Sequence, residues 1–440
     1  ELRKVKAELA TALHAGGADP DAVLALTDAK EALQRRLAAA VSAEAAAVDA
    51  LTPHDLCTSL PPRTAVLELV QRGVGFNEAA TETGLTYDAY LLTPACELVL
   101  TPLGDAGSID DQIERYRELL ASRAPTSRVD RQGKKVRKAV FDPLEDALAD
   151  ADTVQVVPDG AFASLAFATL PTSGGHLLDR YAFRTLDAAV DAVPREAPVP
   201  VGPAVVVGGV DYGSAGEPGT SRASCAAGFP PLPGTSAEAD AVGAMLAPLG
   251  DVRRLGGQAA DETGVVEALE GARMLHLATH GFFATGACRS ALDGTGEAGG
   301  LNPMLLSGLA LAGANTDPAA IWTAEEIATL PLQDVDLVVL SACESGLGEV
   351  AVGEGVLGLQ RAFALSGARA TITSLWPVDD TATRDLMTRF YTALLADPAR
   401  DEAAALRKAQ RGLRDANLAT TGEARPETWG AFVVSGQARR

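Results

Sequence analysis

The sequence predicts an α/β fold in which a doubly wound, mostly parallel sheet is flanked by helices, with a short helical extension at the N-terminus. Strands that are apolar on both faces are typical of parallel sheets covered on both sides. Runs of this kind occupy residues 153–157, 204–210, 274–278, 336–341 and 370–375. Helical patterns alternate with the runs and supply the two covering layers. These patterns occupy residues 237–249, 262–271, 356–365, 381–396 and 402–414.

The first fifty residues differ from the rest. Apolar residues from Leu2 to Leu13 follow helical spacing, a Gly-Gly pair ends the run, and a second helical pattern covers residues 21–47. Two helices alone bury little apolar surface, so we expect them to pack on a neighbour or to continue an upstream helical array. A free coiled coil fits less well, because the heptad pattern is not sustained.

Residues 51–150 mix shorter elements. Strand patterns occupy residues 64–70, 87–92 and 96–101, and helical patterns occupy residues 109–122 and 137–149. The basic segment at residues 127–135 is predicted to be a loop between these two helices.

Composition excludes several classes of function. The chain has 440 residues, 47% of them hydrophobic and 22% charged, which is typical of a globular protein. The net charge of -21 argues against nucleic acid as a direct partner, because phosphate binding needs clustered Lys and Arg. No apolar run reaches the about 18 residues that a membrane-spanning helix requires.

The five cysteines are distributed without a CxxC pair. They are Cys57, Cys96, Cys225, Cys288 and Cys343. An odd number without pairing fits a reducing cytoplasm and argues against a disulfide scaffold. A zinc site built from paired cysteines is also absent, so the sequence predicts a cytoplasmic protein without a metal or another cofactor.

Two of the predicted strands end in reactive side chains. His280 follows the run at residues 274–278, and Cys343 follows the run at residues 336–341. If the two strands are parallel neighbours, both residues emerge at one edge of the sheet, where ligands bind in such folds. A histidine there can take the proton of the thiol and stabilise the nucleophilic thiolate. Backbone N–H groups of Gly281 and Cys343 are candidates for binding the oxyanion.

Other interpretations remain open for these residues. A single Cys or His at a strand end is commonly structural, although both together, with Gly281 and Gly346 in the segments that follow them, favour catalysis. His276 and His280 have the spacing of a zinc-binding pair, but Leu277 replaces the catalytic Glu. On a strand the two residues lie about 13 Å apart and cannot share a zinc ion, whereas on a helix they could. We expect His276 to be structural.

These residues and several further segments resemble the CHAT domain, a caspase-like domain commonly found with tetratricopeptide repeats and related to separases. The matching segments are HGFF from His280, SACESG around Cys343, VPDG from Val157, LPGT from Leu232, NPMLLSGL from Asn302, GEGV from Gly353, SLWPVDD from Ser374 and WGAF from Trp429. The resemblance covers residues 51–440. It implies a pseudo-peptidase half at about residues 51–200 and a catalytic half at about residues 201–440. Residues 1–50 look like the end of a repeat array.

The resemblance implies peptide-bond hydrolysis by a His280–Cys343 dyad. In separases, the Asp that closes a similar Trp segment lies in the pocket for a basic P1 side chain, the side chain before the cleaved bond, and Asp380 holds that place here. Trp376 is expected near the wall of this pocket. Metacaspases use an Asp two residues before the nucleophile, where this chain has Ser341. Asp379 is expected to cap the helix that follows, and a capping role is open for Asp380 as well.

Regulation is a hypothesis. Polar segments at residues 211–230, with Arg222, and 284–300, with Arg289, are candidate lids. These arginines and the basic residues 131–135 are candidate sites of self-processing. Glu354 lies in a Gly-flanked turn, where we expect it to begin the next helix; a role in bracing the active-site loop is the alternative.

The residues and the resemblance together imply a cysteine endopeptidase in bacterial defence or signalling, and the resemblance to separases implies cleavage of a protein substrate after Arg or Lys. An upstream repeat domain or an activator protein is the expected regulatory partner. The alternative is a catalytically silent scaffold that acts through protein contacts. A different cysteine hydrolase fits less well, because no GxSxG-type elbow is present.

Overall fold

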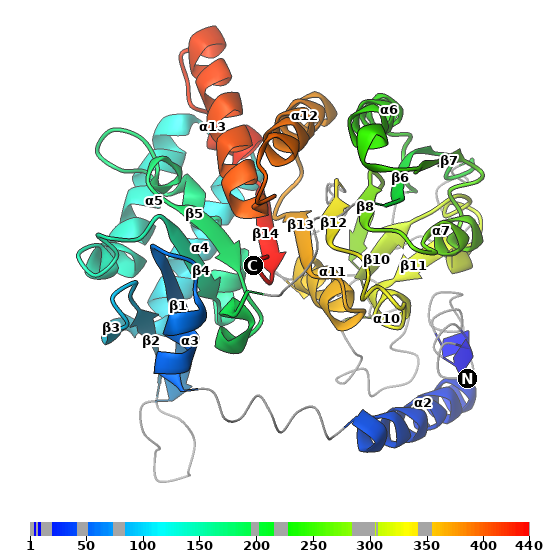
Figure 1. The fold of residues 1–440 in the computed structure, drawn as a ribbon, viewed down its shortest axis with the longest axis horizontal. Helices are drawn as coiled ribbons and strands as arrows, with labels where there is room; N and C mark the ends of the chain where they lie inside the picture. The colour runs from blue at the N-terminus through cyan, green and yellow to red at the C-terminus, as the bar shows by residue number, and fades with distance from the viewer. Residues whose placement is uncertain are drawn as a thin grey trace. The chain divides into compact units, whose positions relative to one another are not determined.

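The computed structural model describes residues 4–5, 8–9, 20–41, 52–73, 84–194, 202–214, 228–283, 304, 307–341 and 354–439 (Figure 1). The chain divides into two compact units. The first unit consists of Glu1–Ala50 and Pro200–Thr371, and the second of Leu51–Val199 and Ile372–Arg440. This division differs from the expected halves, because the last part of the chain belongs with Leu51–Val199.

The first unit contains a parallel sheet in the order β12-β8-β6-β7. In this order the strands are Leu337–Leu340, Met274–Leu277, Ala204–Val210 and Val252–Gly257. All three pairings between neighbours are parallel. Every residue of β8 and β12 is buried, as the apolar runs predict. The parallel sheet expected from the sequence is confirmed for this unit.

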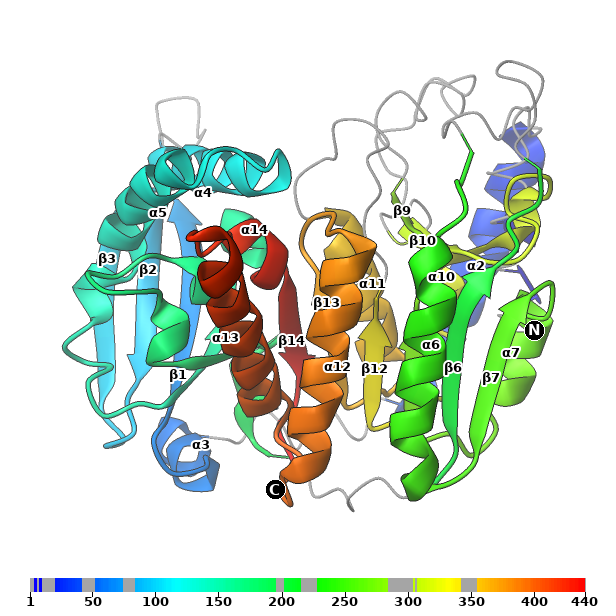
Figure 2. The same cartoon turned by 90° about the horizontal axis from the view of Figure 1, so that it is seen from above.

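Helices cover both faces of the sheet in the first unit (Figures 1 and 2). Helix α6 (Pro233–Leu246) lies on one face, and α7 (Glu262–Ala268) and α11 (Glu354–Leu365) lie on the other. Alternate residues of β6 face the two layers, so Val205 and Val207 join the hydrophobic core that includes residues of α7 and α11.

Smaller elements complete the first unit. A three-stranded antiparallel sheet has the order β11-β10-β9, with β9 at Gly281–Phe283, β10 at Ser307–Ala310 and β11 at Ile321–Thr323. Helix α10 (Ala324–Ile327) follows β11 directly. The N-terminal helix α2 (Pro20–Val41) packs on this unit, because the buried Lys30 lies 3.4 Å from Oε1 of the buried Glu325.

The second unit contains a mixed sheet in the order β3-β2-β1-β4-β5-β14. In this order the strands are Leu98–Asp105, Leu85–Leu92, Thr64–Gly73, Thr153–Val157, Ala182–Thr185 and Phe432–Gly436. Pairing is antiparallel between β3, β2 and β1 and parallel from β1 to β14. Strand β13 (Ala370–Ser374) contains the boundary between the two units.

The helices of the second unit are α3 (Pro53–Ser59), α4 (Ala106–Ala121), α5 (Thr126–Val140), α12 (Asp380–Ala396), α13 (Glu402–Thr421) and α14 (Pro426–Trp429). A buried ion pair joins strand and helix layers, since Nη2 of Arg184 on β5 donates to Oε2 of Glu402 on α13 at 2.7 Å.

The predicted basic loop at residues 127–135 is wrong, because α5 runs through it. Its buried residues recur at helical spacing from Val129 to Val140, and the charged side chains occupy the other face. Gly133 is required by close packing, since a Cβ there would lie 2.7 Å from Cδ of Pro171 and 2.9 Å from Cε2 of Tyr116. A packed helix is a poor site for self-processing.

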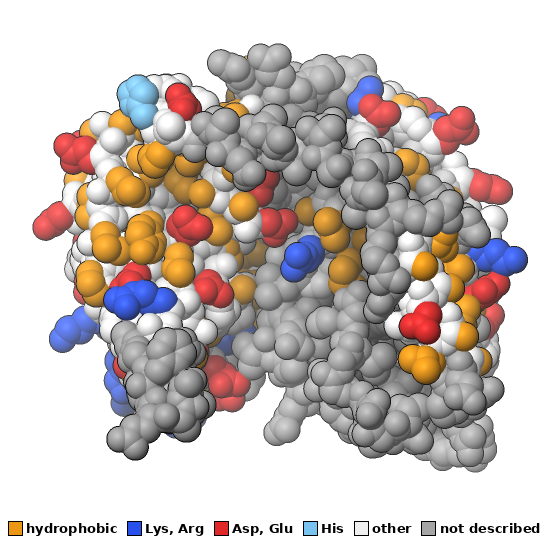
Figure 3. Space-filling view, turned by 90° about the horizontal axis from the view of Figure 1, so that it is seen from below, with side chains coloured by type: hydrophobic (Ala, Val, Ile, Leu, Met, Phe, Trp, Pro, Cys, Tyr) orange, Lys and Arg blue, Asp and Glu red, His pale blue; other side chains and the backbone are white. Residues whose placement is uncertain are grey.

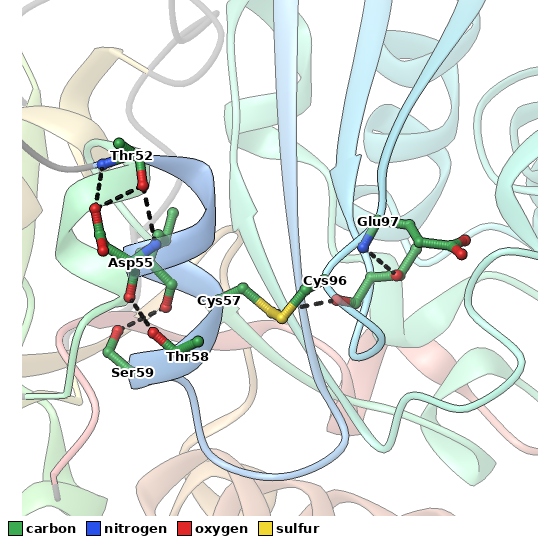
Figure 4. Close-up of a disulfide and its surroundings, with 9 residues drawn as sticks. Thr52, Asp55, Cys57, Thr58, Ser59, Cys96 and Glu97 are labelled. Carbon is green, nitrogen blue, oxygen red and sulfur yellow. Dashed lines mark hydrogen bonds between the residues drawn. A yellow bond between two sulfur atoms is a disulfide. The ribbon is translucent and has the colours of Figure 1, made fainter.

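The expectation of unpaired cysteines is also wrong, because Cys57 and Cys96 form a disulfide (Figure 4). Cys57 lies on α3, which begins with reciprocal hydrogen bonds between Thr52 and Asp55. Cys96 lies in the turn between β2 and β3. Disulfides are typical of oxidising compartments, so the cysteine count no longer supports a cytoplasmic location.

Exposed apolar side chains gather on one face of the second unit, on the left of the view in Figure 3. Leu98 and Leu100 of the edge strand β3 are more than half exposed. Pro102 lies in the same strand and lacks the N–H that a further strand would need, which disfavours pairing at this edge. Among the described residues, no helix combines the length and the apolar character needed to cross a membrane.

His176 is a buried imidazole in the second unit that packs edge-on against the indole of Trp429, with ring centroids 5.0 Å apart. Within the described part of the chain, neither ring nitrogen has a hydrogen-bond partner. Burial lowers the pKa of His176 to about 4, and the positive charge of Arg414 lowers the pKa further than Asp179 raises it.

We predict that the disulfide stabilises the second unit. Its cysteines are 39 residues apart in sequence, and a loop of that length is worth up to about 4 kcal/mol in the chain-entropy model. Cys57→Ser, Cys96→Ser and the double variant should lower the free energy of unfolding equally, because each removes the same bond. Thiol titration of the unfolded, unreduced protein should find at most three free thiols among the five cysteines; finding five would contradict the bridge.

We also predict that His176 makes stability fall with acidification. Its pKa is near 6.5 in the unfolded chain and about 4 in the folded one. Below pH 6.5 the unfolded state therefore binds a proton that the folded state excludes, which costs roughly 3 kcal/mol by pH 4. Urea unfolding of His176→Phe between pH 7.5 and 4.5 should lose this part of the pH dependence, whereas the exposed His54→Gln should retain it. An unchanged slope in His176→Phe would contradict the assignment.

Candidate active site

The two strands that lead to the predicted dyad are parallel neighbours. Leu277 at the end of β8 pairs with Leu340 at the end of β12. His280 follows Leu277, and Cys343 follows Leu340, by the same number of residues. The predicted adjacency of the two strands is therefore confirmed, and their carboxyl ends lie at the same edge of the sheet. Cys343 itself lies outside the described residues.

His280 is almost fully buried, and its Nε2 lies 2.8 Å from the backbone oxygen of Pro230. A carbonyl oxygen only accepts hydrogen bonds, so this contact requires the proton on Nε2. The neutral ring then carries its lone pair on Nδ1, which is the nitrogen able to take a proton from a thiol. The geometry thus selects the tautomer that a general base needs.

Two aromatic rings enclose the imidazole. The ring centroids of Tyr212 and Phe229 lie 5.1 Å and 5.6 Å from that of His280. Thr279 donates from Oγ1 to the backbone oxygen of Ala310 at 2.5 Å and accepts from the Tyr212 hydroxyl at 2.9 Å. These contacts tie the end of β8 to the segment after β6 and to β10.

Gly281 and Ser341, the other described residues of the first unit with a predicted role, lie close in sequence to His280 and Cys343. Gly281 begins β9 and pairs with Leu309 of β10, and the oxygen of His280 accepts from the N–H of Ala310. Ser341 follows β12 and is buried, and its Oγ has no hydrogen-bond partner among the described residues. The oxyanion role of Gly281 and the substrate role of Ser341 stay predictions.

His276 lies within β8, which ends at Leu277, and neither His276 nor His280 lies on the helix that a shared zinc ion would need. Its Nε2 lies 3.1 Å from Oε1 of Glu238 on α6, and both side chains are buried. This contact joins the sheet to its covering helix, as expected of a structural residue. The described residues contain no group of three or more potential metal ligands.

Trp376, Asp379 and Asp380 belong to the second unit. Trp376 is fully buried and donates from Nε1 to the backbone oxygen of Glu427 at 2.9 Å, a packing contact. Asp379 accepts from the N–H groups of Thr381 and Ala382, which confirms its capping role. Asp380 occupies the first turn of α12 and is partly buried. The substrate-binding roles of Trp376 and Asp380 stay predictions.

Several further expectations concern residues outside the described ranges. These include Arg222 and Arg289 and most of the two candidate lids. Glu354 is the first described residue of helix α11.

The sequence did not reveal the groups that hold His280. The Pro230 oxygen is part of the backbone and leaves no trace in residue type. Tyr212 and Phe229 read as single aromatic residues in polar segments, and only folding brings them onto the imidazole ring.

Known proteins resemble this chain at two levels. In sequence, the chain is 31% identical over 116 residues to human tetratricopeptide repeat protein 28, a match that covers 26% of this chain and 4% of that protein. The mouse protein of the same name is 37% identical over 75 residues, covering 17% of this chain and 3% of its own length. The chain thus spans only a small part of these relatives.

In structure, the chain resembles the crystal structure of the Saccharomyces cerevisiae separase–securin complex. The TM-score is 0.51 at 9% identity, and the match covers 88% of this chain and 31% of that chain. An identity this low shows a shared fold alone, which is the caspase-like α/β fold. The model of the CHAT domain family matches residues 130–437. Because this match covers most of the sequence and includes both strand ends of the candidate site, the chain belongs to the CHAT domain family.

Proposed function

We propose that this protein is a cysteine endopeptidase in which His280 is the general base and Cys343 the nucleophile. The observation that carries the proposal is the hydrogen bond between Nε2 of His280 and the Pro230 oxygen, at the edge of the sheet to which β12 also leads. This bond leaves Nδ1 as the basic nitrogen. Membership in a caspase-like family supports the same chemistry.

The reaction follows from these roles. Nδ1 of His280 takes the thiol proton, and the thiolate attacks the carbonyl carbon of the substrate peptide bond. Backbone N–H groups, with Gly281 as a candidate, stabilise the oxyanion. The imidazolium then gives its proton to the leaving amine, which leaves a thioester on Cys343. Water, deprotonated by His280, hydrolyses the thioester and restores the thiol.

We propose a basic P1 side chain for the substrate, with Asp380 as its partner. A carboxylate binds a guanidinium group through two parallel hydrogen bonds, which makes it selective for Arg. The net charge of -21 is compatible with a basic protein substrate. An upstream repeat domain or another protein is the proposed regulator, within bacterial defence or signalling.

Peptide cleavage tests the dyad. Peptides with Arg, Lys, Asp or Leu at P1 should be hydrolysed best after Arg or Lys. Cys343→Ala and His280→Ala should each lower kcat/KM by about a thousandfold or more, because the two residues act as a unit. The exposed His54→Ala is the matched control and should retain full activity. Hydrolysis that persists in Cys343→Ala would contradict the proposal, and a wild-type chain that cleaves no peptide even with a repeat-domain activator would favour the scaffold.

A pair of neighbouring variants tests the pocket. Asp380→Asn should lower kcat/KM for Arg peptides by about 10- to 100-fold and reduce discrimination against Leu, because the charged hydrogen bonds are lost. Asp379→Asn is the control, because asparagine also caps helices and the fold is kept. Equal effects of the two substitutions, or a wild-type preference for Asp at P1, would refute the pocket role of Asp380.

A further inference from the structure

The carbonyl that holds His280 belongs to a short segment that precedes α6. Pro230 supplies the oxygen 2.8 Å from Nε2, and Phe229 packs against the same imidazole ring. Neither residue lies in a strand or helix, so no ladder of backbone hydrogen bonds holds this segment in place. Something else must fix it if the oxygen is to stay in line with the ring.

The side chain of Asn315 fills this need. Its Oδ1 accepts from the N–H of Phe229 at 2.6 Å, and its Nδ2 donates to the oxygen of Phe229 at 3.0 Å. One amide side chain thus makes both hydrogen bonds that a neighbouring strand would make with this residue. The same Nδ2 also donates to the oxygen of Gly213 at 3.0 Å.

The backbone around Asn315 is tied to the same neighbourhood. Its N–H donates to the oxygen of Tyr212 at 2.8 Å, and the N–H of Gly313 donates to the oxygen of Asp211 at 3.0 Å. The loop between β10 and β11 therefore joins the segment after β6 to the segment before α6. These two segments carry Tyr212 and Phe229, the rings that enclose His280.

We propose that Asn315 is a positioning residue that fixes the Pro230 carbonyl and, through it, the tautomer and orientation of His280. The effect of Asn315 on catalysis rests on the proposed function, whereas its effect on the tautomer of His280 does not. The side chain at position 315 is more than nine-tenths buried. It must accept one hydrogen bond, from the N–H of Phe229, and donate two, to the oxygens of Phe229 and Gly213. An uncharged amide has the acceptor and the donors for these three bonds. Aspartate offers no donor and would place a negative charge against two carbonyl oxygens. Leucine has a similar size but offers neither group.

The test is the protonation of the ring nitrogens, read by ¹⁵N NMR of labelled histidine in the full chain. The chain has five histidines, and the spectrum of His280→Gln assigns the signals of His280. In the wild type, we expect a protonated Nε2 and an unprotonated Nδ1. In Asn315→Leu and Asn315→Asp, the two signals should move toward each other as the other tautomer gains population. For each variant that circular dichroism shows to be folded, kcat should fall about 10- to 100-fold while KM stays within about twofold of the wild-type value.

Asn417 provides the matched control. It is a partly buried asparagine in the second unit that donates to Oγ1 of Thr428 at 2.6 Å. Asn417→Leu and Asn417→Asp should leave the His280 signals and kcat unchanged, even where they lower the melting temperature. A purely structural role for Asn315 would give the same result, with lower thermal stability but an unchanged tautomer.

The outcomes separate the inference from the proposed function. Unchanged His280 signals in a folded Asn315 variant would overturn the inference, whatever the activity. Shifted signals in a chain that cleaves no peptide would support the inference and refute the peptidase. If Asn315→Leu does not fold, Asn315→Asp decides, because it keeps the volume and the acceptor for Phe229.

Discussion

The backbone hydrogen bonds between the parallel strands β8 and β12 fix the register of the two strands, and the candidate site depends on this register. Leu277 and Leu340 are partners, so the chain leaves both strands at the same edge of the sheet. A slip of one residue would turn every side chain of a strand to the opposite face and move His276 from α6 into the apolar core that includes α7 and α11. Because both strands are fully buried, such a slip is strongly disfavoured.

Buried polar contacts add specificity to this register. Asp336, just before β12, receives two hydrogen bonds from the guanidinium of Arg369, just before β13, at 2.8 Å and 3.0 Å. Glu238 and His276 connect the sheet to α6. Buried charges cost desolvation energy, so such pairs add little net stability, but a misaligned strand would leave one partner unsatisfied. These pairs therefore favour the observed arrangement of strands and helices over arrangements in which one strand is shifted.

The imidazole of His280 is held differently, by loops and not by the sheet. The Pro230 oxygen fixes its tautomer, two aromatic rings limit its tilt, and the Asn315 amide holds the segment that carries the oxygen. The rigid strand thus places Cα of the histidine, while three chain segments distant in sequence orient its ring. This division is common in enzymes, where a scaffold carries loops that hold the reacting groups.

Sequence patterns predicted the elements that are almost completely buried. Strands β4 and β6 begin and end where the apolar runs do, and all but one residue of each strand is buried, including Gln155 of β4. The pattern was less informative where one face is exposed. The loop predicted in place of helix α5 is wrong because charged residues dominate the composition of this segment, while the buried face of the helix includes Gln132 and Gly133. Short strands such as β5 and β9 are not predicted by the sequence, because three or four residues are too few to show a periodicity.

Residue type and order along the chain were enough to identify the parallel sheet and the strand ends that lead to His280 and Cys343. They also identified the structural role of His276 and the helix cap made by Asp379. These features depend on local periodicity or on residues that are neighbours in sequence. Tertiary structure alone decided which groups surround His280 and which cysteines meet. The Pro230 oxygen is a backbone atom common to every residue, and Cys57 and Cys96 are distant in sequence, so contacts of this kind exist only after the chain has folded.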